Sequence, residues 1–116
     1  TEPTARLLPS RELCRHVQET QPLYPALIRG LARDPHYEAM HRALRDQAAH
    51  RLAAIPRSRN PTVPPEIVAD FLAGAFPTLV HSWLDRGMEH TSEQMDEIFQ
   101  ELVIPGVHVV LASRQR

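Results

Sequence analysis

Residues 65–86 have the pattern of a helix that is apolar around well over half of its circumference. Pro64 and Pro65 open this helix and Gly87 ends it, at the positions where proline and glycine commonly flank helices. A helix in a small domain needs one apolar face for its own core, so the surplus predicts a second protein surface packed against it. The apolar positions are Ile67, Val68, Phe71, Leu72, Ala75, Phe76, Leu79, Val80, Trp83 and Leu84, and a narrow polar stripe runs through Glu66, Asp70, Thr78, His81 and Asp85.

A second C-terminal helix is expected to begin after Thr91. Thr91 and Gln94 have the spacing of a capping box, in which each side chain accepts a hydrogen bond from the other residue's backbone N–H. Apolar residues continue beyond Pro105, so we predict a kinked helix rather than a terminal strand, which would have no other strand to pair with. The expected apolar face comprises Met95, Ile98, Phe99, Leu102 and Val103, and the side expected to face water comprises Glu93, Asp96, Glu97, Gln100 and Glu101.

Prolines divide the N-terminal half into shorter helices. The first helix should begin with Ser10 as its N-cap. A short helix is expected over residues 23–31 and a longer one over residues 35–55, with the proline-rich residues 57–64 as the one long loop. The chain is therefore predicted to be all-α, with about five helices. The expected buried stripes consist of Leu13, Cys14 and Val17 in the first helix and of Tyr37, Met40, Leu44, Ala48, Leu52 and Ile55 in the longer one.

Composition and charge limit the class of protein. The chain has 116 residues, of which 42% are hydrophobic and 23% charged, so residues 1–116 are expected to form one globular domain. The longest apolar run, residues 71–80, is too short and too interrupted to predict a membrane span. A net charge of −1 does not suit a nucleic-acid-binding surface. The single cysteine, Cys14, has no partner for an internal disulfide, so a reducing cytoplasm is the expected compartment. Cys14 itself is expected to be a small buried helix residue.

The two C-terminal helices carry a resemblance to a known family. Residues 63–76, with the sequence VPPEIVADFLAGAF, and residues 82–88, SWLDRGM, resemble the penultimate helix of the C-terminal domains of TetR-family regulators. The segments TSEQM, IF and LVIPG, over residues 91–106, resemble the last helix of the same domains. The resemblance extends over residues 10–113, weakly in the first half and well in the second.

This resemblance implies that the last two helices pair with their copies in a second subunit as a four-helix bundle. It also implies an unidentified small-molecule effector bound among the helices, and an operator-binding helix-turn-helix that is absent from this chain, which starts at Thr1. The chain is then the effector-sensing and homodimerising domain of a cytoplasmic transcriptional repressor. The alternative is a stand-alone helical adaptor, whose apolar penultimate helix docks onto another protein.

Two sets of residues are the candidates for these roles. A largely apolar effector is expected near Pro77, which should kink its helix or free a backbone carbonyl near Ala73. Trp83 suits either the subunit interface or the pocket floor, and the resemblance favours the interface. Gly74, next to an alanine, would let two helix backbones approach closely. The pocket candidates are Tyr37, Met40, His41, Phe76 and Thr78, and the interface candidates are Phe71, Ala75, Leu79, Trp83, Ile98 and Leu102.

Seven histidines raise the question of a metal or catalytic site. Zinc-binding pairs on a helix sit three or four residues apart, whereas His36 and His41 are five apart. His81 and Asp85 are four apart, and would be either two ligands or an exposed hydrogen-bonded pair. Ser82 and its neighbour His81 point about 100° apart on a helix, which does not suit a catalytic triad. No catalytic residue, cofactor or metal site is therefore predicted, and a metal-dependent sensor is a minor alternative.

Overall fold

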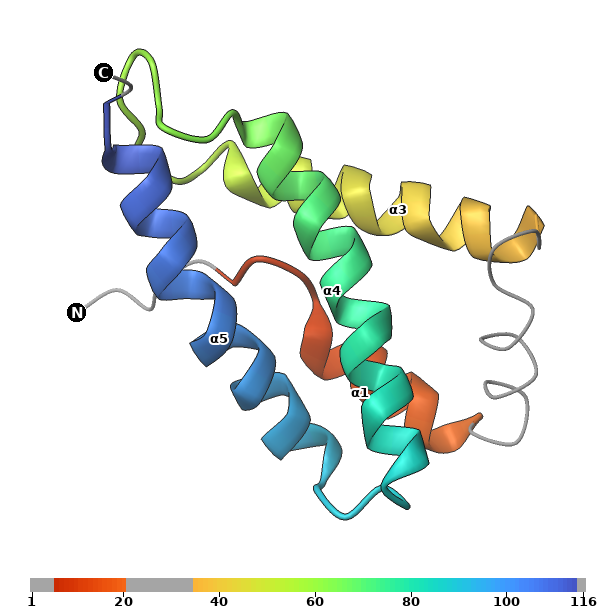
Figure 1. Cartoon of the computed structure of the whole chain (residues 1–116). Helices are drawn as coiled ribbons and strands as arrows, with labels where there is room; N and C mark the ends of the chain where they lie inside the picture. Colours follow the sequence, from red (N-terminus) through yellow and green to blue (C-terminus); the bar gives the residue numbers. More distant parts are fainter. Residues whose placement is uncertain (1–5, 21–34, 115–116) are drawn as a thin grey trace.

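The computed structural model describes residues 6–20 and 35–114, and for residues 35–37 it describes the backbone only. These residues form four helices, α1 (Ser10–Glu19), α3 (Pro35–Leu52), α4 (Pro65–Asp85) and α5 (Ser92–Ala112) (Figure 1). The described part contains no strand, only an isolated bridge between Pro61 and Arg114. The all-α prediction is thus confirmed, while the helix expected over residues 23–31 lies outside the described residues.

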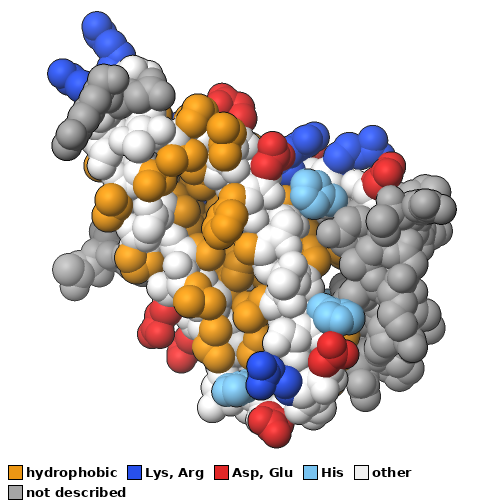
Figure 2. Space-filling model, viewed as in Figure 1, with side chains coloured by type: hydrophobic (Ala, Val, Ile, Leu, Met, Phe, Trp, Pro, Cys, Tyr) orange, Lys and Arg blue, Asp and Glu red, His pale blue; other side chains and the backbone are white. Residues whose placement is uncertain are grey.

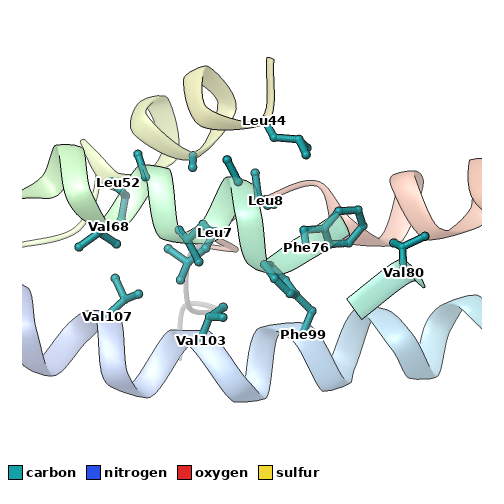
Figure 3. Close-up of a cluster of buried hydrophobic side chains, with 14 of the residues drawn as sticks. Leu7, Leu8, Leu44, Leu52, Val68, Phe76, Val80, Phe99, Val103 and Val107 are labelled. Atoms are coloured by element: carbon teal, nitrogen blue, oxygen red, sulfur yellow. The ribbon is translucent and has the colours of Figure 1, made fainter. Parts of the chain in front are cut away.

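The helices pack mainly as two pairs. α3 packs on α4, which it crosses at a wide angle, and α1 packs on α5, while α4 and α5 have fewer contacts with each other (Figure 1). The core lies between these pairs and takes apolar side chains from all four helices. Leu7 and Leu8, in the segment before α1, add two fully buried side chains to it (Figure 3). The predicted buried stripe of α1 is confirmed for Cys14 and Val17, each 1% exposed.

A left-handed turn ends α4 where glycine was expected to end it. Gly87 has φ +77° and Met88 has φ 57°. The Met88 N–H donates to the Trp83 carbonyl at 2.9 Å, and the Gly87 N–H donates to the Leu84 carbonyl at 3.1 Å. These two bonds form a Schellman motif, which satisfies carbonyls that the end of a helix leaves free.

Gly87→Ala should lower the free energy of unfolding by about 1–2 kcal/mol, because a Cβ disfavours the left-handed region. Space is not the cause, since a Cβ added at Gly87 would meet no atom within 4 Å. Urea titration of the two proteins measures the difference. Gly87→Asn is the matched control and should lose less, because asparagine tolerates this conformation better. Equal losses for alanine and asparagine would contradict this explanation.

Both C-terminal helices contain an internal proline and continue past it. α4 runs through Pro77, and the Thr78 hydroxyl donates to the Gly74 carbonyl at 3.0 Å in the turn that contains Pro77. α5 runs through Pro105 to Ala112, so the predicted helix is confirmed over a terminal strand.

The predicted capping box at the start of α5 is also confirmed. The Thr91 N–H donates to Gln94 Oε1 at 2.8 Å, and the Gln94 N–H donates to Thr91 Oγ1 at 3.0 Å. Both interactions are local, so they depend on residues only three positions apart. They satisfy backbone N–H groups at the helix start and fix where α5 begins.

The loop between α3 and α4 closes the C-terminal end of α5. The Ser58 N–H donates to the Leu111 carbonyl and the Thr62 N–H to the Ser113 carbonyl, both at 2.9 Å. The Ser58 hydroxyl adds a bond of 3.0 Å to the Ser113 carbonyl. Carbonyls at a helix end need such donors. These bonds therefore fix the irregular backbone of residues 58–62 against the end of α5.

α4 is the one described helix that is long and apolar enough, by length and composition, to cross a membrane. Of its most apolar 18 residues, 44% are buried inside the protein. The central helix of a soluble domain has the same length and composition. Part of the apolar surface of α4 stays exposed, at Ile67 and Phe71.

Candidate functional site

Exposed apolar side chains gather along α4 and α5 on one side of the molecule (Figure 2). On α4, Ile67 is 57% exposed and Phe71, one turn later, is 62% exposed. On α5, Leu102 is 70% exposed and Val109, two turns later, is 63% exposed. We call the surface formed by these four residues the α4–α5 face. Large apolar side chains in one contiguous surface region are typical of a protein–protein contact.

A groove of about 380 Å³ runs between the two helices of this face. Apolar side chains line it, and Gly106 contributes no side chain at all. A Cβ added at Gly106 or at Gly74 would meet no atom within 4 Å, so space is open above the backbone at both glycines. The groove is lined by Val63, Ile67, Val68, Phe71, Leu102, Val103, Gly106, Val107 and Val110.

The structure brings some of the interface candidates to this face and places others beneath it. Phe71 and Leu102 are exposed on the face. Ala75, Leu79 and Ile98 are half-buried and pack against the core. All five residues remain predicted interface residues, because a single chain does not test contacts with a second subunit.

Trp83 lies inside the protein rather than on its surface. Its side chain is 2% exposed, and its indole Nε1–H donates to the His90 carbonyl at 2.9 Å. Sequence reasoning instead missed Ile67 and Val109, which are exposed on the face. Their spacing from the interface candidates was available as a signal, since Ile67 precedes Phe71 by four residues and Val109 follows Leu102 by seven.

The pocket candidates occupy different environments. Phe76 is 4% exposed and packs edge-to-face on Phe99, with ring centroids 5.2 Å apart and an angle of 85° (Figure 3). Thr78 is exposed, while Met40 packs half-buried against the core and His41 is half-buried with an interaction partner of its own. The side chain of Tyr37 lies outside the described residues. None of the four described candidates lines the groove, so a shared pocket remains a prediction.

The side of α5 that packs on α1 carries two buried polar residues, contrary to the prediction that both face water. Asp96 is 5% exposed and Gln100 is 4% exposed. Gln100 Oε1 accepts the Leu7 N–H at 3.1 Å. Gln100 Nε2 donates to the Leu8 carbonyl at 3.2 Å and to the Ser10 hydroxyl at 2.8 Å. Every polar atom of this amide therefore has a partner in the segment that enters α1.

Asp96 binds the same segment through two other groups. The Ser10 hydroxyl donates to Asp96 Oδ1 at 2.5 Å, and Arg6 forms an ion pair with Asp96 Oδ2. Ser10 is therefore not the N-cap that the sequence predicted, since Pro9 occupies that position with no side-chain cap. Its hydroxyl is used across the helix interface instead. Arg6 neutralises a carboxylate that would be costly to bury alone.

The thiol of Cys14 is buried in α1, near the polar cluster formed by Arg6, Ser10, Asp96 and Gln100. Burial, and secondarily the negative charge of Asp96, raises the pKa of Cys14 from 9.0 to about 12. A thiol is nucleophilic mainly as the thiolate, so the raised pKa should make Cys14 react slowly in the folded chain. The structure confirms the predicted small buried helix residue, which is 1% exposed.

We expect Cys14 to react with a disulfide reagent at pH 8 about a thousandfold more slowly in the folded chain than in the unfolded chain, because a pKa raised from 9.0 to about 12 removes that share of thiolate. Absorbance of the released thiol follows the reaction, with the same chain in denaturant as the control. Rapid labelling of the folded protein would contradict the burial of this thiol.

The described residues contain no group of three or more histidine, cysteine, aspartate or glutamate side chains placed to hold a metal ion. His81 and Asp85 form an exposed pair, with Nε2 and Oδ2 3.0 Å apart, on the solvent side of α4.

Comparison with known proteins places the domain in a family. No curated protein and no solved structure is detectably similar to the chain. The family described as "Transcriptional regulator C-terminal region" (TetR_C_8) matches residues 10–105, which include all of α1, α3 and α4 and most of α5. The chain therefore belongs to the family of C-terminal regions of TetR-type transcriptional regulators.

Proposed function

We propose that this chain is the homodimerisation and effector-sensing domain of a TetR-type repressor, and that two copies associate through the α4–α5 face. The exposed apolar face is the observation that carries the proposal. Its four large side chains, Ile67, Phe71, Leu102 and Val109, are more than half exposed in the single chain. In a two-fold dimer, the four side chains of both copies would be buried around the symmetry axis. The two copies of α4 and α5 would then form a four-helix bundle.

A second copy suits this surface better than an unrelated partner. The α4–α5 face is apolar and lies on two consecutive long helices, the type of surface from which a self-complementary bundle is built. The family match covers both helices and describes the C-terminal region of a regulator. The stand-alone adaptor is not favoured, because it accounts for the exposed face but not for the family match.

The test is the sedimentation behaviour of Leu102→Arg. In the proposed dimer the substitution places two buried guanidinium groups in the interface, so dimer affinity should fall by about 100-fold or more. The single chain should stay folded, because Leu102 is 70% exposed. Ala49→Arg, at an exposed position of α3, adds the same charge away from the face and should leave the dimer intact. A wild-type chain that sediments as a monomer at tens of micromolar would refute the dimer.

Effector sensing is the second part of the proposal and is supported by the family alone. The ligand would be a small, largely apolar molecule, held among the helices near Met40, His41 and Phe76. Ligand binding would change the distance between the operator-binding parts of the two subunits, which precede this domain in regulators of this type. A thermal-shift screen of apolar compounds tests it, since a ligand at 100 times its Kd stabilises a protein by about 2.7 kcal/mol.

A further inference from the structure

The segment that enters α1 is bound to the side of α5 opposite the α4–α5 face. Gln100 and Val109 are nine residues apart, so at about 100° per residue they point in opposite directions from α5. Their exposures agree with this geometry, at 4% for Gln100 and 63% for Val109. One helix therefore contacts the proposed partner on one side and the entering segment on the other.

Residues 6–10 are attached to α5 by polar and directional interactions. Asp96 and Gln100 together make four hydrogen bonds and one ion pair to this segment. Leu7 and Leu8 are 0% exposed beside these bonds. An apolar contact alone would allow the segment to slide along α5, whereas bonds to backbone N–H and carbonyl groups fix its register.

The packing of the helices makes this attachment mechanically relevant. α1 packs mainly on α5, and α3 packs mainly on α4. The α4–α5 face is therefore built from one helix of each pair. A partner that holds the face sets the position of α5, and the bonds at Asp96 and Gln100 make residues 6–10 follow.

We propose that Asp96 and Gln100 form a latch through which pairing of the α4–α5 face with a second copy fixes the segment that enters α1. The latch rests on the dimerisation proposed above. Its function is to transmit the state of the subunit interface toward the N-terminal side of the domain, where a regulator of this type carries its operator-binding part.

The test measures hydrogen exchange of the Leu7 amide, which donates to Gln100 Oε1. We expect the exchange in the dimeric wild type to be at least about tenfold slower than in the monomeric Leu102→Arg variant. In Gln100→Ala this dependence on the dimer should disappear. Because coupling between two sites is reciprocal, Gln100→Ala should also weaken the dimer by a factor similar to the one lost in exchange.

The matched control is Glu97→Ala, which changes an exposed residue of the same helix between the two latch residues. It should alter neither the exchange of the Leu7 amide nor the dimer affinity. If Gln100→Ala does not fold, Ser10→Ala replaces it, since this smaller change removes the hydroxyl bonds to Asp96 and Gln100 only.

Two results would overturn the latch in different ways. Equal Leu7 exchange in the wild-type dimer and in the Leu102→Arg monomer would leave the dimer standing and show that Asp96 and Gln100 are structural only. A wild-type chain that sediments as a monomer at tens of micromolar would overturn the proposed dimer together with the latch. Sedimentation and exchange are separate measurements, so the two failures are distinguishable.

Discussion

Phe99→Ala should lower the free energy of unfolding by about 3–5 kcal/mol, the usual cost of removing a large aromatic side chain from a core. Phe99 is 2% exposed, and its ring packs edge-to-face on Phe76 with centroids 5.2 Å apart. The loss is a large part of the stability of a typical small domain, about 5–15 kcal/mol. Urea denaturation followed by circular dichroism measures it. Adding Phe76→Ala should cost less than it does alone, because the ring contact is already lost.

Phe71→Ala is the matched control for this substitution, since it removes the same side chain from a position that is 62% exposed. In the single chain it should change stability by less than about 1 kcal/mol. Its effect should instead grow with protein concentration, because the side chain is proposed to be buried only in the dimer. A loss from Phe71→Ala as large as that from Phe99→Ala at low concentration would contradict the burial pattern described above.

Gln100→Leu is the second substitution with a large expected effect. Leucine has nearly the volume of glutamine but leaves the Leu7 N–H and the Leu8 carbonyl without their partners. A buried polar group without a partner costs about 1–3 kcal/mol, and this variant creates two. The midpoint of urea denaturation should fall accordingly, with an unchanged slope.

Gln47→Leu provides the control, because Gln47 is an exposed residue of α3. The same chemical change there should alter the free energy of unfolding by no more than about 0.5 kcal/mol. A wild-type stability for Gln100→Leu would mean that water replaces the lost amide, and it would remove the energetic basis of the polar cluster.

Features that depend on neighbouring residues were predictable from the sequence. The capping box of Thr91 and Gln94 needs only a hydroxyl and an amide three positions apart, and it forms as predicted. The end of α4 at Gly87 likewise follows from the conformational freedom of glycine. Helical periodicity also gave the apolar faces of α4 and α5, although it did not say which apolar residues face the chain's own core.

Features that depend on distant residues were not predictable in the same way. Ser10 has the local signature of an N-cap, but its hydroxyl binds Asp96, which is 86 residues away in the sequence. Asp96 and Gln100 were expected to face water because charged and amide side chains usually do. One signal pointed the other way. Asp96, Gln100, Val103 and Val107 share a helix side and are all buried, so the spacing placed the two polar residues beside core positions.

The residues of the candidate site also differ in how far the sequence could predict them. Phe71 was identified because an over-apolar helix needs a partner, which is a property of the sequence pattern, and Leu102 because the resemblance implies that the last helix pairs with a second subunit as well. Trp83 suited either the interface or the pocket floor and was assigned to the interface because the family resemblance favoured it, but its side chain is 2% exposed and its indole N–H donates to the His90 carbonyl. A helical wheel does not distinguish the two apolar sides of a helix that is packed on one of them.

The bond between Leu7 and Gln100 spans 93 residues, and this distance bears on the order in which the chain folds. During synthesis, Leu7 and Leu8 leave the ribosome long before the α5 residues that cover them. Contacts with such large sequence separation form late, because closing a long loop costs entropy before the contact stabilises the chain. The burial of these two side chains is therefore complete only when the last fifth of the domain has been made, and we expect the nascent chain to depend most on chaperones before that point.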